Sequence, residues 1–286
     1  MPLTILITTD ELSARLDNVE LVIVDCRFDL ADVGKGRRDY ELSHIPGAVY
    51  ADLNRDLASV PTGMNGRHPL PEPRAFVRTL EQLGIGNDTQ VVAYDQDVGM
   101  YASGLWWMLR WMGHDAVAVL DGGYAKWSAE QRSTTSGVES KPAGTFTGEA
   151  HGAMIASVDD VARSANLLDA RAPERYRGDV EPLDRVAGHI PGARNHFYRN
   201  NVTADGIFRT PNELRELFTP TLGDTSAEGL VCYCGSGVTA CHNLLALEHA
   251  GLHGARLYPG SWSEWSSDPA RPVGRGSEPR ISGEAE

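Results

Sequence analysis

Three of the four cysteines lie close together, in the stretch VCYCGSGVTACHNLL at residues 231–245. Cys232, Cys234 and Cys241 share this stretch with His242 and a Gly-Ser-Gly turn. Such a cluster could bind zinc, form a redox pair, or present one nucleophile. A zinc site needs four converging ligands, usually from two Cys-x2–4-Cys knuckles, and the sequence has no second knuckle. Adjacent Cys241 and His242 would point about 100° apart on a helix, so no metal is expected.

Cys234 is the member of the cluster that its surroundings present as a nucleophile. The residues before it, GLVCYC, are typical of a buried strand, and TACHNLLALEHAG after it is typical of a helix. A glycine-rich turn between them can aim several backbone N–H groups at one point, and the helix N-terminus adds positive potential. Both effects favour the thiolate of Cys234 over the thiol. Gly235 and Gly237 permit the tight curl of the turn.

The rest of the chain supplies elements that can position such a turn. LVIVDC (21–26), VVAYD (91–95) and AVAVLDG (116–122) are typical of strands, whereas residues 72–84 and 101–113 are typical of helices. This alternation predicts an α/β fold with a mainly parallel sheet. The stretch around Cys234 is one more strand–turn–helix unit of the same kind.

The chain also repeats itself, in the same order and with an offset that drifts only from about 144 to about 138 residues. Four pairs of segments match: IVDCRF (23–28) with LLDARA (167–172), SHIPGAVY (43–50) with GHIPGARN (188–195), VVAYDQDVG (91–99) with LVCYCGSGV (230–238), and GGYAKW (122–127) with GSWSEW (260–265). The repeat predicts two homologous α/β domains.

Domain boundaries follow from the repeat and from local composition. We expect a first domain at residues 1–132 and a second at 153–274. Residues 133–152 are rich in Gly, Ser and Thr and poor in large apolar groups, as is typical of a linker. Residues 275–286 are expected to be a disordered tail.

The repeat singles out Cys234 among the cysteines. Asp95 occupies the equivalent position in the first repeat, so the first domain is expected to be an inactive copy. Cys26 falls where the second repeat has an alanine, which is typical of a buried apolar group. Cys232 is expected within a strand and Cys241 on a helix, both as structural residues.

Bulk composition narrows the classes of partner. The formal net charge of −13 argues against nucleic acid, which requires a basic surface. The N-terminal residues show no signal-peptide pattern, and no apolar run reaches the roughly 18–20 residues of a membrane helix. With only four cysteines and no disulfide framework, a reducing cytoplasm is the expected location.

Two classes of enzyme place a nucleophilic cysteine on such a loop. A tyrosine-type phosphatase requires Cys-x5-Arg, whose arginine binds two phosphate oxygens. Here the sixth residue after Cys234 is Ala240, and residues 235–240 carry no charge. Phosphate chemistry is therefore disfavoured, and the other class is sulfur transfer.

The sequence resembles the tandem-domain rhodanese family of sulfurtransferases. The resemblance rests on the paired HIPGA segments, on DGGYAKW and GSWSEW, on the loop CGSGVT at residues 234–239, and on Asp95 in place of a cysteine. It covers nearly the whole chain outside the linker and tail. The uncharged CGSGVT loop looks like the mercaptopyruvate branch, whereas the thiosulfate branch typically has basic residues there, as in CRKGVT. Thiosulfate carries two charges and gains from such cations, whereas 3-mercaptopyruvate carries a single carboxylate.

The resemblance implies a double displacement at Cys234. The thiolate would attack the donor sulfur and become a persulfide, and a thiol, thioredoxin or cyanide would then remove the outer sulfur. The loop N–H groups would hold the anionic sulfur. The residues concerned are Gly235, Ser236, Gly237, Val238 and Thr239.

The resemblance also implies further site residues. In the mercaptopyruvate branch an Asp, a His and the loop Ser form a proton relay, which maps onto Asp52, His68 and Ser236. An arginine for the donor carboxylate maps onto Arg175. A second maps onto Arg185 in the segment EPLDRVAGHIPG.

The segment that holds the second arginine departs from the family pattern. The span from Arg175 to GHIPG is shorter than in the mercaptopyruvate enzymes, and Asp184 competes with Arg185 for the aligned position. Arg171 has a counterpart, Arg27, in the inactive repeat, so we expect it to be a structural ion-pair partner.

The expected function is that of a sulfurtransferase without a cofactor, acting on a small anionic donor. The donor is 3-mercaptopyruvate, with a thiosulfate-preferring rhodanese as the alternative. A persulfide carrier that does not turn over small donors is the alternative from another class. No membrane or nucleic-acid partner is expected.

Overall fold

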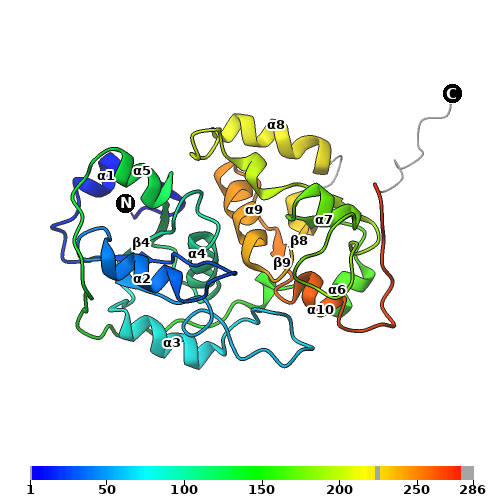
Figure 1. The fold of residues 1–286 in the computed structure, drawn as a ribbon, viewed down its shortest axis with the longest axis horizontal. Coiled ribbons are helices and arrows are strands. Elements are labelled where there is room, and N and C mark those ends of the chain that lie inside the picture. The colour runs from blue at the N-terminus through cyan, green and yellow to red at the C-terminus, as the bar shows by residue number, and fades with distance from the viewer. Residues whose placement is uncertain (1, 223–225, 278–286) are drawn as a thin grey trace.

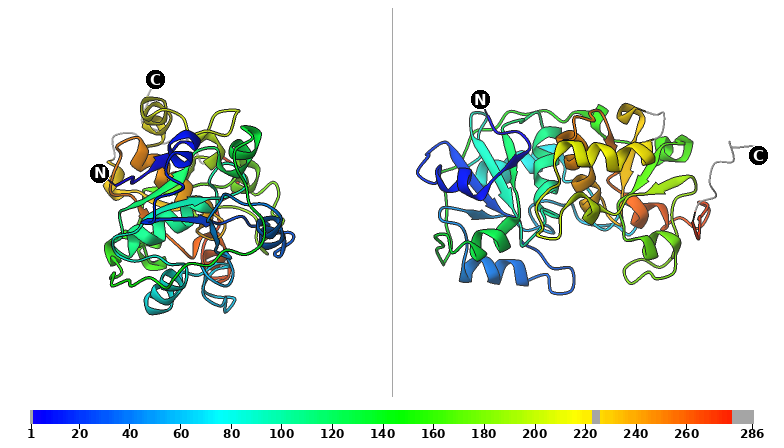
Figure 2. Two further views of the ribbon diagram at one scale, coloured as in Figure 1. Left: turned by 90° about the vertical axis from the view of Figure 1, so that its left-hand side faces the viewer. Right: turned by 90° about the horizontal axis from the view of Figure 1, so that it is seen from above.

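The computed structural model describes residues 2–222 and 226–277 of the chain. Figure 1 shows two α/β halves side by side, the first drawn in blue to green and the second in green to red. Each half contains a parallel sheet flanked by helices, as the two further views in Figure 2 also show. The predicted α/β class with parallel sheets is therefore confirmed.

The first half contains a five-stranded sheet in the order β1-β5-β4-β2-β3, in which every pair is parallel. Its central strands have almost no exposed residues, because both faces of a parallel sheet are covered. The strands are β1 (Leu6–Ile7), β2 (Leu21–Asp25), β3 (Val49–Tyr50), β4 (Gln90–Tyr94) and β5 (Val117–Leu120). The helices are α1 (Thr9–Ser13), α2 (Lys35–Leu42), α3 (Pro73–Gln82), α4 (Ala102–Trp111) and α5 (Gly123–Ala129).

The second half repeats this order with four strands, β7-β6-β8-β9. A parallel bridge between Ile155 and Leu257 takes the place of the missing edge strand. The strands are β6 (Leu167–Asp169), β7 (Ala193–Asn195), β8 (Val231–Tyr233) and β9 (Arg256–Leu257). The helices are α6 (Val158–Arg163), α7 (Pro173–Arg177), α8 (Pro211–Leu222), α9 (Val238–His249) and α10 (Ser261–Trp265), with short 3-10 turns at Gly152–Met154, Tyr198–Asn201 and Ala227–Gly229.

Equivalent ion pairs lie at the carboxyl ends of β2 and β6. Arg27 Nη2 lies 2.6 Å from Asp25 Oδ2, and Arg171 Nη2 lies 2.7 Å from Asp169 Oδ2. All four side chains are almost completely buried. The prediction that Arg171 is a structural ion-pair partner is confirmed, since a buried charge of this kind requires a partner.

The two halves meet where α4 packs against α9 (Figure 1). Almost every residue of α4 is buried, because one side of this helix covers its own sheet and the other faces α9. One continuous hydrophobic cluster therefore includes Trp107 and Met108 of α4 together with Leu244 and Leu247 of α9. Among the described residues, no helix is both long enough and apolar enough to cross a membrane.

The predicted linker at residues 133–152 follows the surface of the first half. Its Thr135 pairs with His44, its Gly144 N–H donates to Glu81 O at 2.8 Å, and its Phe146 is buried. The tail predicted from residue 275 lies mostly outside the described residues. Within them, Gly276 N–H donates to Arg177 O at 2.9 Å.

Candidate active site

Cys234 follows strand β8 directly and is the first residue of the turn that leads into α9. Its N–H donates to Ser261 Oγ at 3.1 Å, and its carbonyl accepts from Trp262 N–H at 3.0 Å. Gly237 ends the turn with a φ of +86°, and a Cβ there would lie 2.7 Å from Pro259 O. Only glycine fits this position, so the turn closes tightly and Cys234 is 2% exposed.

The other three cysteines are buried thiols. Cys232 lies inside β8, and Cys26 directly follows β2. Cys241 lies in the first turn of α9, where its Sγ–H donates to Gly237 O at 3.3 Å. Burial raises the pKa of Cys26, Cys232 and Cys241 above that of an ordinary cysteine, which keeps these thiols protonated. Cys234 is buried like these three and differs from them in its position, at the start of the loop between β8 and α9.

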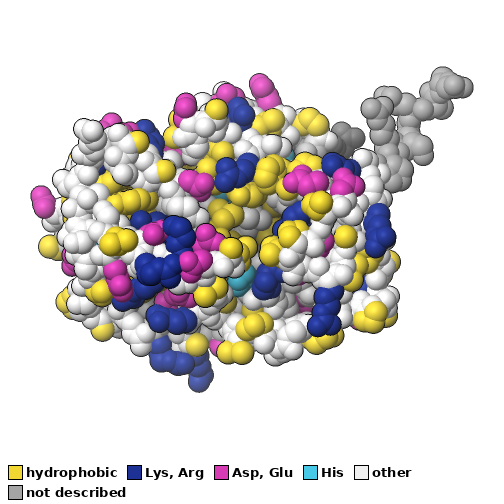
Figure 3. All heavy atoms as spheres, viewed as in Figure 1, with side chains coloured by type: hydrophobic (Ala, Val, Ile, Leu, Met, Phe, Trp, Pro, Cys, Tyr) yellow, Lys and Arg dark blue, Asp and Glu magenta, His cyan; other side chains and the backbone are white. Residues whose placement is uncertain are grey.

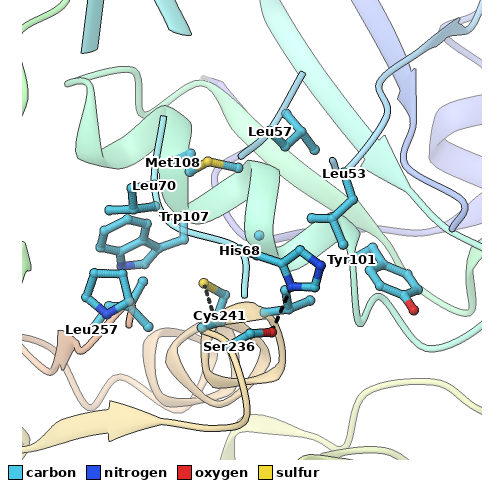
Figure 4. A pocket seen from close by; sticks show the side chains of 14 residues that line it. Leu53, Leu57, His68, Leu70, Tyr101, Trp107, Met108, Ser236, Cys241 and Leu257 are labelled. Carbon is cyan, nitrogen blue, oxygen red and sulfur yellow. Dashed lines mark hydrogen bonds between the residues drawn. The ribbon is translucent and has the colours of Figure 1, made fainter. Parts of the chain in front are cut away.

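The first half contributes a histidine to the loop after Cys234. His68 Nδ1 lies 2.8 Å from Ser236 Oγ, and Figure 4 shows the two side chains pointing toward each other from different halves of the molecule. Burial, helped by the neighbouring Arg67 charge, lowers the pKa of His68 to about 4. His68 is therefore a neutral imidazole at pH 7, and the structure brings it together with Ser236 as the sequence predicts.

Contacts with the second half hold His68 in place. Arg67 N–H donates to Ser263 Oγ at 3.0 Å. Gly66 approaches so closely that a Cβ there would lie 2.9 Å from Gly260 O. The segment that carries His68 is thus anchored to the residues that follow the catalytic sheet.

The Asp52 carboxylate is hydrogen-bonded within its own turn. Its Oδ1 accepts hydrogen bonds from Asn54 N–H at 2.9 Å and Arg55 N–H at 3.1 Å, which caps the turn after β3. In the described part of the chain no hydrogen bond joins Asp52 to His68. The structure therefore brings together two of the three residues of the predicted relay.

The arginines of the site differ from the predicted pair. A Cβ on Gly235 would lie 3.6 Å from Arg175 Nη2, so Arg175 lies beside the loop that follows Cys234. Arg185 is exposed and enters none of the hydrogen bonds or ion pairs of the described residues. Arg67 Nη2 instead lies 3.0 Å from the same Cβ position. Sequence reasoning missed Arg67, although its place beside His68 was the available signal.

Two carboxylates accompany these arginines. Arg67 Nη1 donates to Asp184 Oδ1 at 2.6 Å, and Arg175 Nη2 donates to Glu181 Oε1 at 2.6 Å. Burial raises the pKa of Asp184, and the positive charge of Arg67 opposes this shift. Asp184 thus lies inside the site, one residue before the predicted Arg185.

An apolar pocket adjoins Ser236 and His68 (Figure 4). Both halves line it, with Leu53, Leu70, Tyr101 and Trp107 from the first and Val238, Cys241 and Leu257 from the second. On the face in Figure 3, hydrophobic side chains gather in the hollow between the two halves, and acidic and basic side chains intermix around it.

The first half has a matching loop in which Asp95 replaces the cysteine. The Asp95 carboxylate accepts hydrogen bonds from four backbone N–H groups at 2.6 to 3.1 Å, those of Asp97, Gly99, Tyr101 and Ala102. Burial raises the pKa of Asp95 to about 6 although these N–H groups oppose the shift. The loop therefore directs four N–H groups at one carboxylate, two at each of its oxygens.

Comparisons with known proteins agree with this geometry. The family described as "Rhodanese-like domain" matches residues 8–130 and 153–268. A Pseudomonas aeruginosa protein named "Probable 3-mercaptopyruvate sulfurtransferase" is 47% identical over 280 residues, 95% of this chain and 98% of that one. The thiosulfate sulfurtransferase of Cricetulus griseus is 35% identical over 259 residues, 86% of this chain and 84% of that one. The structure of 3-mercaptopyruvate sulfurtransferase from Leishmania major matches with a TM-score of 0.83 and 32% identity, over 92% of this chain and 74% of that one.

Proposed function

The chain belongs to the rhodanese family of sulfurtransferases, and we propose that it transfers sulfur from 3-mercaptopyruvate through a persulfide on Cys234. The observation that carries this proposal is the position of Cys234. It stands just before α9, with Ser236 and His68 hydrogen-bonded beside it. The other described cysteines are buried structural thiols.

In the first proposed step the Cys234 thiolate attacks the sulfur of the donor. A Cys–S bond forms, the donor C–S bond breaks, and its electron pair goes to carbon. The resulting pyruvate enolate takes up one proton and leaves as pyruvate. The loop N–H groups of residues 235–239 stabilise the sulfur anion, as the equivalent groups stabilise the Asp95 carboxylate.

In the second proposed step an acceptor removes the outer sulfur. A thiolate attacks that sulfur, the S–S bond breaks, and Cys234 leaves as thiolate. A small thiol, thioredoxin or cyanide could serve as acceptor, because each is a nucleophile toward sulfur. The four cysteines are free thiols, which supports action in a reducing compartment such as the cytoplasm.

The proposed proton relay consists of Ser236 and His68. With its proton on Nδ1, the neutral His68 can donate to Ser236 Oγ while the Ser236 hydroxyl donates to the developing enolate. As the Ser236 proton moves to the enolate, the Nδ1 proton moves to Ser236 and a solvent proton is taken up at Nε2 of His68. We leave Asp52 out of this relay because its carboxylate is bound within its own turn.

The uncharged loop favours 3-mercaptopyruvate over thiosulfate as donor. Gly235, Ser236 and Gly237 add no positive charge for a second anionic group. A thiosulfate-preferring enzyme is the second candidate, because a relative of that name matches most of the chain.

Steady-state kinetics with both donors test the proposal, using wild type, Cys234→Ser, and Cys26→Ala as the matched control. Alanine is the natural residue at the position equivalent to Cys26 in the second repeat, where Ala170 is fully buried. We expect Cys234→Ser to lower kcat/KM by about 1000-fold or more and to abolish the mass increase of one sulfur atom after donor addition. Cys26→Ala should keep both.

Three outcomes would change the assignment. Near wild-type turnover by Cys234→Ser would overturn it entirely. A preference for thiosulfate above about tenfold, or about 1.4 kcal/mol of transition-state stabilisation, would reverse the donor assignment alone. A single sulfur loaded on Cys234 without repeated turnover would identify a carrier.

A further inference from the structure

A buried network of alternating charges lies beside the catalytic loop. Arg67 pairs with Asp184, and Arg175 pairs with Glu181 and lies 3.6 Å from Asp184. Glu181 also lies 3.3 Å from Arg171, which belongs to the structural pair with Asp169. The side chains of Asp184 and Glu181 are only 8% and 3% exposed, so water screens these charges poorly.

Both arginines keep donors that face the loop. Arg67 Nη2 and Arg175 Nη1 enter none of the hydrogen bonds found among the described residues. A Cβ on Gly235 would lie 3.0 Å from the first and 3.7 Å from the second. Two guanidinium NH2 groups therefore converge on the space beside the residue that follows Cys234, where a donor carboxylate would lie.

The two buried carboxylates cancel the charge of this arginine pair. Arg67 and Arg175 contribute two positive charges, and Asp184 and Glu181 contribute two negative charges. The site thus offers hydrogen-bond donors with no net positive charge. A carboxylate with one negative charge can bind through the two NH2 groups, whereas a dianion places two negative charges in a site of zero net charge and is repelled more strongly by Asp184 and Glu181.

We propose that Arg67 of the first domain and Arg175 of the second bind the donor carboxylate together, and that Asp184 makes the site selective for monoanionic over dianionic donors. This inference rests on the proposed function, because it concerns the donor of the same reaction. Arg67 is then a specificity-determining residue, and it is supplied by the first domain, which has Asp95 at the position of Cys234. The two domains share the donor site between them.

Asp184→Asn tests whether Asp184 makes the site selective for monoanionic donors. Asparagine keeps the shape of the side chain and leaves the site with one uncompensated positive charge. We expect the ratio of kcat/KM for thiosulfate to that for 3-mercaptopyruvate to rise by roughly tenfold or more. High salt should reduce this gain. Asp179→Asn removes an exposed carboxylate five residues away and should leave the ratio unchanged.

Arg67→Gln tests whether Arg67 binds the donor carboxylate, and this test does not depend on whether the Asp184→Asn variant folds. We expect KM for 3-mercaptopyruvate, and the dissociation constant of pyruvate measured by calorimetry on the full chain, to rise by roughly tenfold or more. The kcat at saturating donor should fall much less. Arg185→Gln is the comparison, since the sequence predicts a donor contact there and the structure leaves that side chain exposed.

The outcomes separate this inference from the proposed function. If Asp184→Asn keeps Cys234-dependent turnover and the ratio of kcat/KM for thiosulfate to that for 3-mercaptopyruvate is unchanged, only the role of Asp184 in donor selectivity is overturned. Weaker pyruvate binding in Arg185→Gln, but not in Arg67→Gln, would overturn the assignment of Arg67. Absence of Cys234-dependent turnover with either donor would remove the proposed function itself.

Discussion

Cys234 differs from the other cysteines in its position in the fold and not in burial, since all four thiols are buried. Cys232 lies inside β8, and Cys241 lies in the first turn of α9, where it lines the apolar pocket. Burial disfavours the thiolates of both. Cys234 lies at the end of the strand, and the residue after it, Gly235, faces the guanidinium groups of Arg67 and Arg175.

The hydrogen bond between His68 and Ser236 predicts coupled effects on catalysis. Ser236→Ala and His68→Asn should each lower kcat with 3-mercaptopyruvate by about 100-fold, because each removes the same proton path. The double variant should be little worse than either single one, a coupling of about 2–3 kcal/mol in a double-mutant cycle. Independent, additive losses would contradict a shared relay. Ser128→Ala, on the exposed side of α5, is the control and should match wild type.

At the scale of elements, the loops after β4 and β8 occupy equivalent positions in the two halves and differ in the side chain at their first residue. In the second half the space inside the loop is where we propose that the transferred sulfur binds. In the first half the Asp95 carboxylate fills that space and accepts four N–H groups. The first loop has thereby become a structural element, which explains how a domain without a nucleophile keeps the same turn.

Replacing Asp95 should therefore destabilise the first half. Asp95→Ala leaves four N–H groups of a buried loop without their acceptor, and we expect a loss of about 3 kcal/mol or more in the free energy of unfolding. Urea unfolding at pH 7.5 measures this loss, with Asp115→Ala at an exposed position as control. A loss below about 1 kcal/mol would show that the loop does not depend on the carboxylate.

The whole molecule is a single working unit because its two halves share one core and one site. The packing of α4 on α9 sets the distance between the segment of His68 and the loop of Cys234. A second connection lies nearby, where His242 Nε2–H of α9 donates to Val98 O in the Asp95 loop at 2.9 Å. Asn201 Nδ2 donates to the other ring nitrogen at 3.1 Å, which fixes His242 in its neutral form.

This connection predicts a loss of stability in acid. Burial lowers the pKa of His242 to about 4, so between about pH 6.5 and 4 the unfolded chain binds a proton that the folded chain does not. Stability is therefore lost as pH falls through this range, by up to about 1.4 kcal/mol per pH unit for this group. His68 acts in the same direction, whereas Asp95, with a raised pKa, acts in the opposite one.

Unfolding followed by circular dichroism from pH 7.5 to 4.5 isolates the part due to His242. We expect His242→Gln to be less stable than wild type at pH 7.5 and to lose stability less steeply as pH falls, because the proton taken up on unfolding is gone. An identical slope in the variant and wild type would mean that His242 does not govern this range.

The sequence by itself determined the local features of the protein. Strand, turn and helix around Cys234 follow from residues adjacent in the chain, and the repeat placed Asp95 opposite it. The same locality explains why the α/β class and the Arg171 pair were predicted correctly, since Asp169 is only two residues away.

Tertiary structure decided which distant residues meet. His68 and Ser236 are 168 residues apart and Arg67 and Asp184 are 117 apart, so their contacts depend on how α4 packs on α9. A spacing pattern cannot encode that packing, because it is set by side-chain shapes on both helices at once. For this reason Arg67, and not Arg185, lies beside the catalytic loop, and Asp52 stays within its own turn.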